Sequence, residues 1–253
     1  MSLSEAQIAE FRRKGFIVVK GFFGSEEMAR ISKWLSDMAE SEGGGEAKFF
    51  EASETTGDGI LVRVEDLFGG NNPEFTELLI SPEVRACLAE LFGEEPVLFK
   101  EKINYKLPGC RADKLHQDQA AGWNRYCDFF ITMAVAVDEN RQDNAALSFM
   151  SSGNYERGLM TPEWETMSED DPPYAPADEY ALLEADPGDV IFFDCYVPHG
   201  SPPNTGQRSR RNIFLTFNRL SDGDMRAQYY ADKAESYPAN DAASARAADS
   251  YRV

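Results

Sequence analysis

The chain is poor in cysteine and in positive charge, and each shortage excludes a class of protein. Its four cysteines (Cys87, Cys110, Cys127 and Cys195) form no CxxC pair and no metal-binding spacing. Free thiols in a reducing cytoplasm are the interpretation that fits this scatter. Lysine and arginine number 25 against 44 acidic residues, a formal net charge of −19. This balance excludes the basic face that nucleic acids and anionic membranes require, so any anionic ligand needs a local basic island.

Long apolar runs are also missing. No stretch approaches the roughly 18 uncharged apolar residues of a membrane-spanning helix. Residues 1–15 show neither the apolar segment nor the small-residue cleavage site of a secretory signal. Hydrophobic residues nevertheless make up 42% of the chain, which is enough for a substantial core. We expect one cytoplasmic domain over residues 1–253, and the sequence leaves its oligomeric state open.

The local patterns change along the chain from helical to β-rich. Residues 1–95 carry two capped helical segments, a helical region broken at Pro82, and short strand-like runs between them. From about residue 96 to 220, short runs of β-branched and aromatic residues are bounded by Pro, Gly, Asn and Asp. This order predicts a mainly β fold with flanking helices and a jelly-roll core, the cupin-like double-stranded β-helix. A small, polar C-terminal tail is expected to fray.

The two histidines of the chain lie in a pattern that suits a metal ion. His116 and Asp118 are one residue apart, so on an extended strand both side chains project to the same face. His199 follows the apolar run 189–197, where we expect a strand to end at the mouth of a barrel. Two histidines and one carboxylate form the facial triad of non-haem iron(II) oxygenases, which keeps three coordination positions open. The alternative is that both histidines are ordinary core or surface residues.

Arg210 opens the run 210–218, eleven residues after His199, and shares one strand face with alternate residues of that run. An arginine directed into a barrel is costly unless it meets an anion. A dicarboxylate co-substrate held by both guanidinium nitrogens supplies such an anion. The alternative is a solvated cluster with Arg208 and Arg211, which is the interpretation we favour for Arg208.

These residues lie in longer phrases that resemble the phytanoyl-CoA dioxygenase superfamily of Fe(II)/2-oxoglutarate oxygenases. The resemblance covers roughly residues 5–238, and its marks are HQD (116–118), the turn region 138–154, PGDVIFFDCYVPHGSPPN (187–204) and RRNIFLTFN (210–218). The chain departs from the usual pattern at Ala145 and Ala146, where glycine and cysteine are common, and at Asn154, where histidine is common.

The resemblance implies a set of site residues and co-substrates. Fe(II) is expected to bind His116, Asp118 and His199, with 2-oxoglutarate and O₂ at the open positions. Relatives that halogenate lack the carboxylate, so Asp118 implies hydroxylation. The residues expected to contact 2-oxoglutarate are Arg210, Asn104 and Thr132.

Within the superfamily, the phrases 100–109, 192–204 and 221–238 are similar to bacterial organophosphonate hydroxylases. Those enzymes hydroxylate the carbon next to phosphorus in 2-aminoethylphosphonate or its N-trimethylated form. A phosphonate needs cationic donors, such as the lysines that alternate on the strand face of 100–104, and its cationic end needs ring faces with an acid nearby. The candidate substrate-binding residues are Trp123, Tyr126, Lys102, Arg63 and Tyr196, with Lys100 as a further candidate. For the two lysines a solvated strand edge is the alternative, and the interpretation we favour; for Trp123 the alternative is packing in the core.

Three alternatives stay open at this point. The first is a hydroxylase of another small zwitterion, ectoine-like or derived from an amino acid. The second is a metal-binding cupin that does not use O₂. The third is a β-barrel binding module without enzymatic activity. Arg210 counts against the second alternative, because its expected role has no partner without 2-oxoglutarate.

Overall fold

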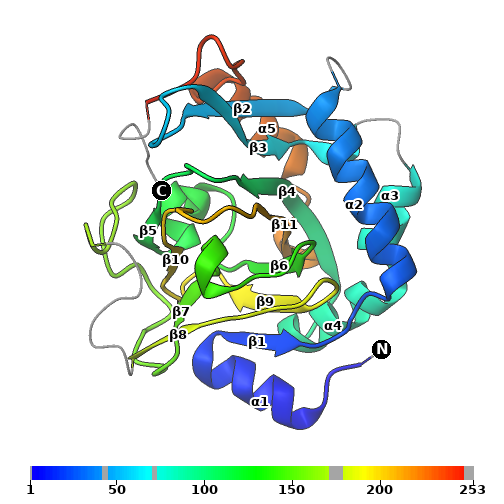
Figure 1. Cartoon of the computed structure of the whole chain (residues 1–253). Coiled ribbons are helices and arrows are strands. Elements are labelled where there is room, and N and C mark those ends of the chain that lie inside the picture. The colour runs from blue at the N-terminus through cyan, green and yellow to red at the C-terminus, as the bar shows by residue number, and fades with distance from the viewer. Residues whose placement is uncertain (1, 42–44, 70–72, 171–178, 248–253) are drawn as a thin grey trace.

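The computed structural model describes residues 2–41, 45–69, 73–170 and 179–247. Its strands are β1 Phe16–Val19, β2 Ala47–Ala52, β3 Gly59–Glu65, β4 Pro96–Lys106, β5 Asp113–His116, β6 Ile131–Ala136, β7 Ser148–Met150, β8 Tyr180–Leu182, β9 Val190–Asp194, β10 His199–Ser201 and β11 Arg210–Arg219. They form a seven-stranded sheet in the order β1-β9-β6-β11-β4-β3-β2 and a four-stranded sheet in the order β5-β10-β7-β8 (Figure 1). The strand pairs of both sheets are antiparallel throughout the described residues, as the predicted jelly-roll core requires.

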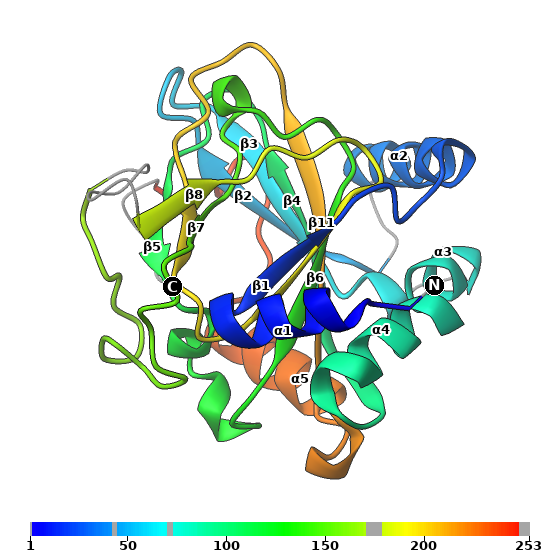
Figure 2. The same ribbon diagram turned by 90° about the horizontal axis from the view of Figure 1, so that it is seen from below.

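Helices cover the outer face of the larger sheet. They are α1 Glu5–Lys14, α2 Ser25–Glu40, α3 Pro73–Leu79, α4 Pro82–Phe92 and α5 Arg226–Ser236. Figure 2 shows α1 against β1, and α2, α3 and α4 on the side away from β5, β7 and β8. The apolar stripe of α2 buries Ile31 and Leu35 in the same cluster as Ile213 of β11, which fixes the sheet from outside. None of the described helices is long and apolar enough to cross a membrane.

The predicted signals at the helix ends are confirmed at α1 and corrected at α2. The Ser4 hydroxyl accepts a hydrogen bond from the Gln7 backbone N–H, and the Gln7 side chain accepts one from the Ser4 N–H, so both groups of a capping box are paired. Gly15 ends α1 in the left-handed conformation (φ 80°). In α2, Ser25 is the N-cap that the sequence pattern predicts, but Gly24 occupies this position and Ser25 is already helical.

The interior of the barrel is set by the register of β4 and β11. Arg210 lies opposite Lys106, and Phe214 lies opposite Lys102. Directly opposed residues of an antiparallel pair point to the same face, so alternate residues of these two strands face inward. Apolar rings from the two sheets, among them Phe149, Phe193 and Phe214, fill the inner part of the barrel below the polar residues.

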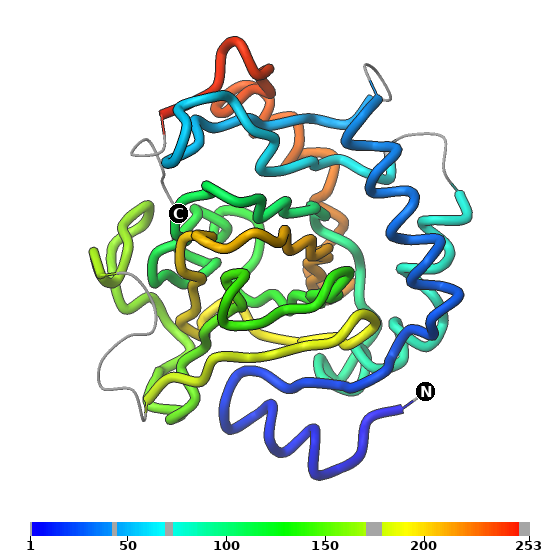
Figure 3. The backbone as a smooth tube through the Cα atoms, in the orientation of Figure 1, coloured from blue at the N-terminus to red at the C-terminus, as the bar shows by residue number. Residues whose placement is uncertain are grey.

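The C-terminal region differs from the expectation of a frayed tail. Helix α5 packs against the barrel: Arg226 Nε donates to the buried Glu101 carboxylate (3.0 Å). The chain then runs beside β2, where Arg246 N donates to Phe50 O (3.0 Å) and Asn240 Nδ2 donates to the same oxygen (2.9 Å) (Figure 3). This edge pairing orders the tail as far as residue 247, because the open edge of β2 offers unpaired backbone groups. Residues 248–253 lie outside the described part.

Candidate active site

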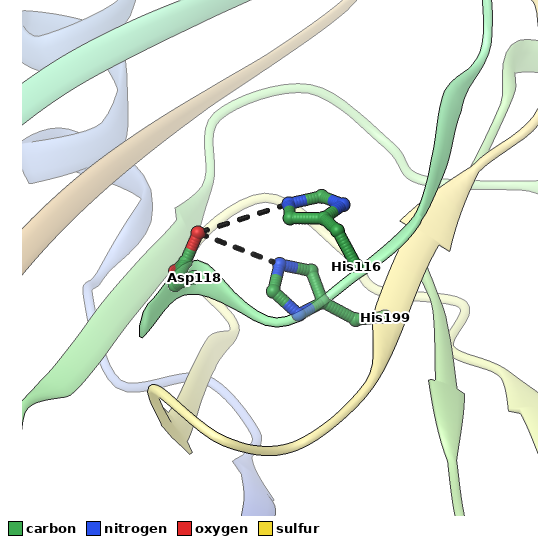
Figure 4. Close-up of side chains that lie close together, drawn as sticks. All are labelled: His116, Asp118 and His199. Atoms are coloured by element: carbon green, nitrogen blue, oxygen red, sulfur yellow. Dashed lines mark ion pairs between the residues drawn. The ribbon is translucent and has the colours of Figure 1, made fainter. Parts of the chain in front are cut away.

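His116, Asp118 and His199 meet inside the barrel, and both rings point to the carboxylate (Figure 4). The Nε2 atoms of His116 and His199 lie 3.8 Å and 3.9 Å from the same Asp118 Oδ1. One ligand atom from each side chain lies within 4.8 Å of the others, and each residue is 9% exposed or less. The histidines are cross-strand neighbours on β5 and β10, so hydrogen bonding of the smaller sheet holds the rings side by side.

The backbone places these side chains somewhat differently from the expectation. Strand β5 ends at His116, and Asp118 begins the 3₁₀ helix η2 (Asp118–Ala121). Gln117 between them is still extended (φ −108°, ψ 133°), which keeps its two neighbours on one side, as predicted. Its own side chain is fully buried on the other side, where it donates to Gly158 O (2.9 Å) and Tyr196 O (2.7 Å).

His199 opens a strand instead of following the end of one, which corrects the prediction at this position. The preceding strand β9 ends at Asp194, whose Oδ1 accepts hydrogen bonds from the backbone N–H groups of Tyr196 and Val197 (both 2.9 Å). These bonds hold the turn that returns the chain to β10. The turn therefore sets where the imidazole of His199 enters the barrel.

The protonation states of the cluster suit a divalent metal. Nδ1 of His116 lies 2.7 Å from Lys114 O, and Nδ1 of His199 lies 3.0 Å from Val197 O. A proton on each Nδ1 satisfies these carbonyls and leaves the Nε2 lone pairs facing Asp118. Burial, with His199 beside it, lowers the pKa of His116 to about 4, so its ring is neutral. Two imidazoles whose Nε2 atoms face one carboxylate are a donor set that fits Fe(II).

A cavity of about 420 Å³ opens onto the three side chains. Its wall is mainly polar on the β4 side and aromatic on the side of η2 and α5. Its charged, polar and aromatic lining residues include Arg63, Lys100, Lys102, Asn104, Lys106, Trp123, Tyr126, Trp164, Tyr229 and Asp232.

Lys100 is buried and Lys102 is half-buried, and neither has a counter-ion among the described residues. In the described part of the chain neither ammonium group has an ion-pair partner, and each lies over a ring instead: Lys100 Nζ is 4.9 Å from the Trp123 ring, and Lys102 Nζ is 5.1 Å from that of Phe214. Burial, reinforced by the neighbouring Lys100, lowers the pKa of Lys102 to about 8. The carboxylate of Asp118 acts on both lysines in the opposite sense.

Arg63 is a cation of a different kind, because it is already paired. Its Nε lies 3.0 Å from Glu65 Oε1, and Lys233 Nζ lies 2.6 Å from Glu65 Oε2. Burial raises the pKa of Glu65, but Lys233 and Arg63 outweigh burial and hold it far below its ordinary value. Two cations thus share one buried carboxylate, and this group carries net positive charge at the cavity wall.

Arg210 points into the barrel beside Lys106 and is 1% exposed. It forms no ion pair with any residue that the structure describes, and its buried Nε has no hydrogen-bond partner there. Burial lowers the pKa of Arg210 to about 10, with Asp113 acting in the opposite sense. Arg208, in contrast, is half exposed and paired with Glu139 and Asp143, which confirms the solvated interpretation for that residue.

Comparison with known proteins identifies this arrangement. The model of the family described as Phytanoyl-CoA dioxygenase (PhyH) matches residues 11–212. The chain belongs to this family. A 2-aminoethylphosphonate dioxygenase from uncultured bacterium HF130_AEPn_1 is 36% identical over 237 residues, which cover 93% of this chain and 89% of the relative. A methylphosphonate hydroxylase from Gimesia maris is 31% identical over 236 residues, covering 93% and 88%.

Solved structures show the same fold. EctD from S. alaskensis with 2-oxoglutarate and 5-hydroxyectoine has a TM-score of 0.73 at 23% identity, and the match covers 87% of this chain and 77% of EctD. The protein is therefore a phytanoyl-CoA dioxygenase family member with a jelly-roll core, and it is an iron- and 2-oxoglutarate-dependent dioxygenase.

The structure brings most of the predicted site residues of this dioxygenase to the cavity. Trp123, Tyr126, Lys102, Arg63 and Asn104 all line it. Three predicted residues lie outside the cavity wall. Arg210 is buried on β11 opposite the lining residue Lys106. The Thr132 hydroxyl pairs with that of Thr216 (2.9 Å), and the Tyr196 hydroxyl donates to Asp128 O (2.8 Å); neither belongs to the cavity wall.

Trp164, Tyr229 and Asp232 are among the lining residues that were not predicted from the sequence. Trp164 lies in a segment without regular periodicity. Tyr229 and Asp232 lie on α5, and Tyr229 is the helix's one buried residue in the described chain, so the apolar stripe that marks an amphipathic helix is weak. The spacing of Tyr229 and Asp232, three residues, is the signal that places both on one helix face.

Proposed function

We propose that this dioxygenase hydroxylates a small phosphonate at the carbon next to phosphorus, with 2-aminoethylphosphonate as the first candidate. The observation that carries the proposal is the pair of uncompensated ammonium groups of Lys100, which is buried, and Lys102, which is half-buried, in the cavity that holds the histidine–aspartate cluster. The two relatives at 36% and 31% identity, a 2-aminoethylphosphonate dioxygenase and a methylphosphonate hydroxylase, support it.

In this proposal His116, Asp118 and His199 hold Fe(II). When bound together, iron, 2-oxoglutarate and O₂ supply an oxidant strong enough to attack an unactivated C–H bond. The chain's contribution is to fix the ligands and exclude water. The hydrogen bonds from Nδ1 to Lys114 O and Val197 O fix both ring orientations, and the burial of the cluster keeps bulk water away.

Arg210 is the residue that we assign to the distal carboxylate of 2-oxoglutarate. A guanidinium that is buried without an anion is unfavourable, and a carboxylate bound by two parallel N–H donors removes this cost. Asn104 lines the cavity and lies opposite Asn212 in the register, two positions from Arg210. Its amide is placed to donate to the same co-substrate.

The phosphonate group is assigned to Lys100 and Lys102, with Arg63 as the third cation. A phosphonate carries up to two negative charges, which match the two uncompensated ammonium groups. Both lysines line the same cavity as His116, Asp118 and His199, and the Asp118 carboxylate acts electrostatically on both, which supports this assignment. A phosphorus atom held there keeps its neighbouring carbon close to the iron site, because only one bond separates the two atoms.

The test is a comparison of substrates with the iron-loaded enzyme in air. We expect oxygen-dependent succinate release, with a new ³¹P resonance of a 1-hydroxyphosphonate, for 2-aminoethylphosphonate and at lower rate for its N-trimethyl form and methylphosphonate. Ectoine, which carries a carboxylate in place of phosphorus, is the competing substrate. Turnover of ectoine without turnover of any phosphonate would contradict the proposal.

A matched pair of variants tests the carrying observation directly. Lys102→Met removes one cavity ammonium group while it keeps the length of the side chain, and we expect a rise of roughly tenfold or more in KM for the phosphonate. Lys33→Met removes a lysine that is exposed on α2 and paired with Asp37, and it should leave kinetics unchanged.

A further inference from the structure

Asp232 differs from the other carboxylates that line the cavity. Glu51 is paired with Arg111 (2.9 Å), Asp113 is paired with Lys106 (3.0 Å), and Asp118 belongs to the metal cluster. In the described part of the chain, Asp232 has only neutral hydrogen-bond donors: its Oδ2 accepts from the Tyr126 hydroxyl (2.7 Å) and its Oδ1 from Gln228 Nε2 (2.6 Å).

The cavity wall therefore carries uncompensated charge of both signs. The positive charges come from β4, at Lys100 and Lys102, and the negative charge comes from α5, at Asp232. The next residue on α5, Lys233, is directed to Glu65, which lies 2.6 Å from its Nζ and which it shares with Arg63, and it forms no ion pair with Asp232 in the described chain. Arg125 also lines this end, is exposed, and forms no ion pair with Asp232 in the described chain. A wall with separated positive and negative charge is complementary to a zwitterion.

Trp164 adds an aromatic surface near the end of η2. Its backbone is left-handed (φ 66°), an unusual conformation for a bulky residue, and its N–H donates to Ala120 O (2.8 Å). The indole lies directly against Gly122, where an added Cβ would be 2.8 Å from Trp164 Cζ2. The ring is thus held at the cavity wall although the residue is 47% exposed.

We infer that Asp232, Tyr126 and Trp164 form a subsite for the ammonium pole of the substrate, an inference that rests on the proposed function. Asp232 supplies the opposite charge, and the two rings supply apolar surface that an ammonium group tolerates. A primary ammonium donates three hydrogen bonds, and the carboxylate has lone pairs left to accept them. A trimethylammonium has no N–H to donate. The subsite therefore selects primary 2-aminoalkylphosphonates over their trimethylated forms.

The experiment compares two phosphonates on the full-length, iron-loaded enzyme. Asp232→Asn keeps the shape of the side chain and an acceptor for the Tyr126 hydroxyl, but removes the charge. We expect kcat/KM to fall roughly tenfold for 2-aminoethylphosphonate, and to change less than twofold for methylphosphonate, which has no ammonium group. Glu235→Gln, on the exposed part of the same helix, is the matched control and should change neither value.

The outcomes separate the inference from the function on which it rests. An equal loss for both phosphonates, or no loss for either, in a folded Asp232→Asn enzyme would overturn the subsite while leaving phosphonate hydroxylation in place. Trp164→Ala gives a second reading: the preference for 2-aminoethylphosphonate over methylphosphonate should shrink, and an unchanged ratio would remove Trp164 from the subsite. If the unmodified enzyme turns over no phosphonate, the proposed function and the subsite are both refuted.

Discussion

Replacing Arg210 by methionine is expected to stabilise the protein without 2-oxoglutarate and to abolish its response to 2-oxoglutarate. Burial lowers the pKa of Arg210 from 12.5 to about 10. A shift of this size corresponds to a cost of about 3 kcal/mol for holding the charge in the folded state. The folded-state pKa lies below the unfolded value, so this cost is fully present at neutral pH and is relieved only as pH rises above about 10.

Removing the buried guanidinium should raise the free energy of unfolding by this amount, but part of the increase is offset in the Arg210→Met variant. In the amide orientation that best satisfies its neighbours, Asn212 accepts a hydrogen bond from Arg210 Nη1 (2.9 Å), and losing it costs about 1 kcal/mol. We therefore expect Arg210→Met to unfold with a free energy about 2 kcal/mol higher than the parent enzyme in the absence of co-substrate. The parent should gain about 2.7 kcal/mol from 2-oxoglutarate at one hundred times its Kd, and the variant nothing.

Urea denaturation monitored by tryptophan fluorescence, with and without 2-oxoglutarate in the presence of Fe(II) under argon, measures both effects. Arg208→Met is the matched control: this side chain is exposed and ion-paired, so stability should change by less than about 1 kcal/mol and the response to 2-oxoglutarate should persist. A destabilised Arg210→Met protein that is still stabilised by 2-oxoglutarate would refute the reasoning.

Three further predictions concern other parts of the site. His199→Ala should reduce bound iron, measured by metal analysis after gel filtration, to background without loss of the folded circular-dichroism spectrum; stoichiometric iron in the variant would exclude the ligand role. Lys102 has a pKa of about 8, set by burial and by the nearby charges of Lys100, Asp118, Arg63 and Glu65, so its ammonium group loses a proton as pH rises. We therefore expect kcat/KM for the phosphonate to fall above about pH 8. This fall should be absent in Lys102→Met. Glu65→Gln leaves two buried cations without their carboxylate and should cost roughly 3–5 kcal/mol of unfolding free energy; a loss below about 1 kcal/mol in urea denaturation would show that the pairing is weak.

Period-two alternation explains why much of the site was predictable. Lys100, Lys102 and Asn104 were placed on one strand face, and all three line the cavity. The same rule placed Arg210 on the inner face of its strand, which its register with Lys106 confirms. The rule is reliable here because it depends only on the local geometry of the backbone, which makes successive side chains of any extended strand point to opposite faces.

Residues outside regular strands were the ones that escaped prediction. Trp164 lies in a segment with no period, and its place at the cavity is fixed by a single backbone bond and by contact with Gly122. Tyr196 was predicted to offer a ring face to the cationic end of the substrate, but a turn bound by Asp194 directs its hydroxyl to Asp128. In turns, side-chain direction depends on long-range contacts instead of chain periodicity.

The sequence by itself determined which three side chains form the histidine–aspartate cluster, the β-rich core, and the strand face that the two lysines and Arg210 occupy, since each follows from residue type and from the short-range geometry of strands. Only the tertiary structure decided which charges are compensated. Arg208 and Arg210 lie two residues apart, yet Arg208 pairs with carboxylates at the surface and Arg210 is buried without an ion pair in the described chain. Compensation requires partners that are distant in the chain, as Glu65 is for Lys233, and folding alone brings such partners together.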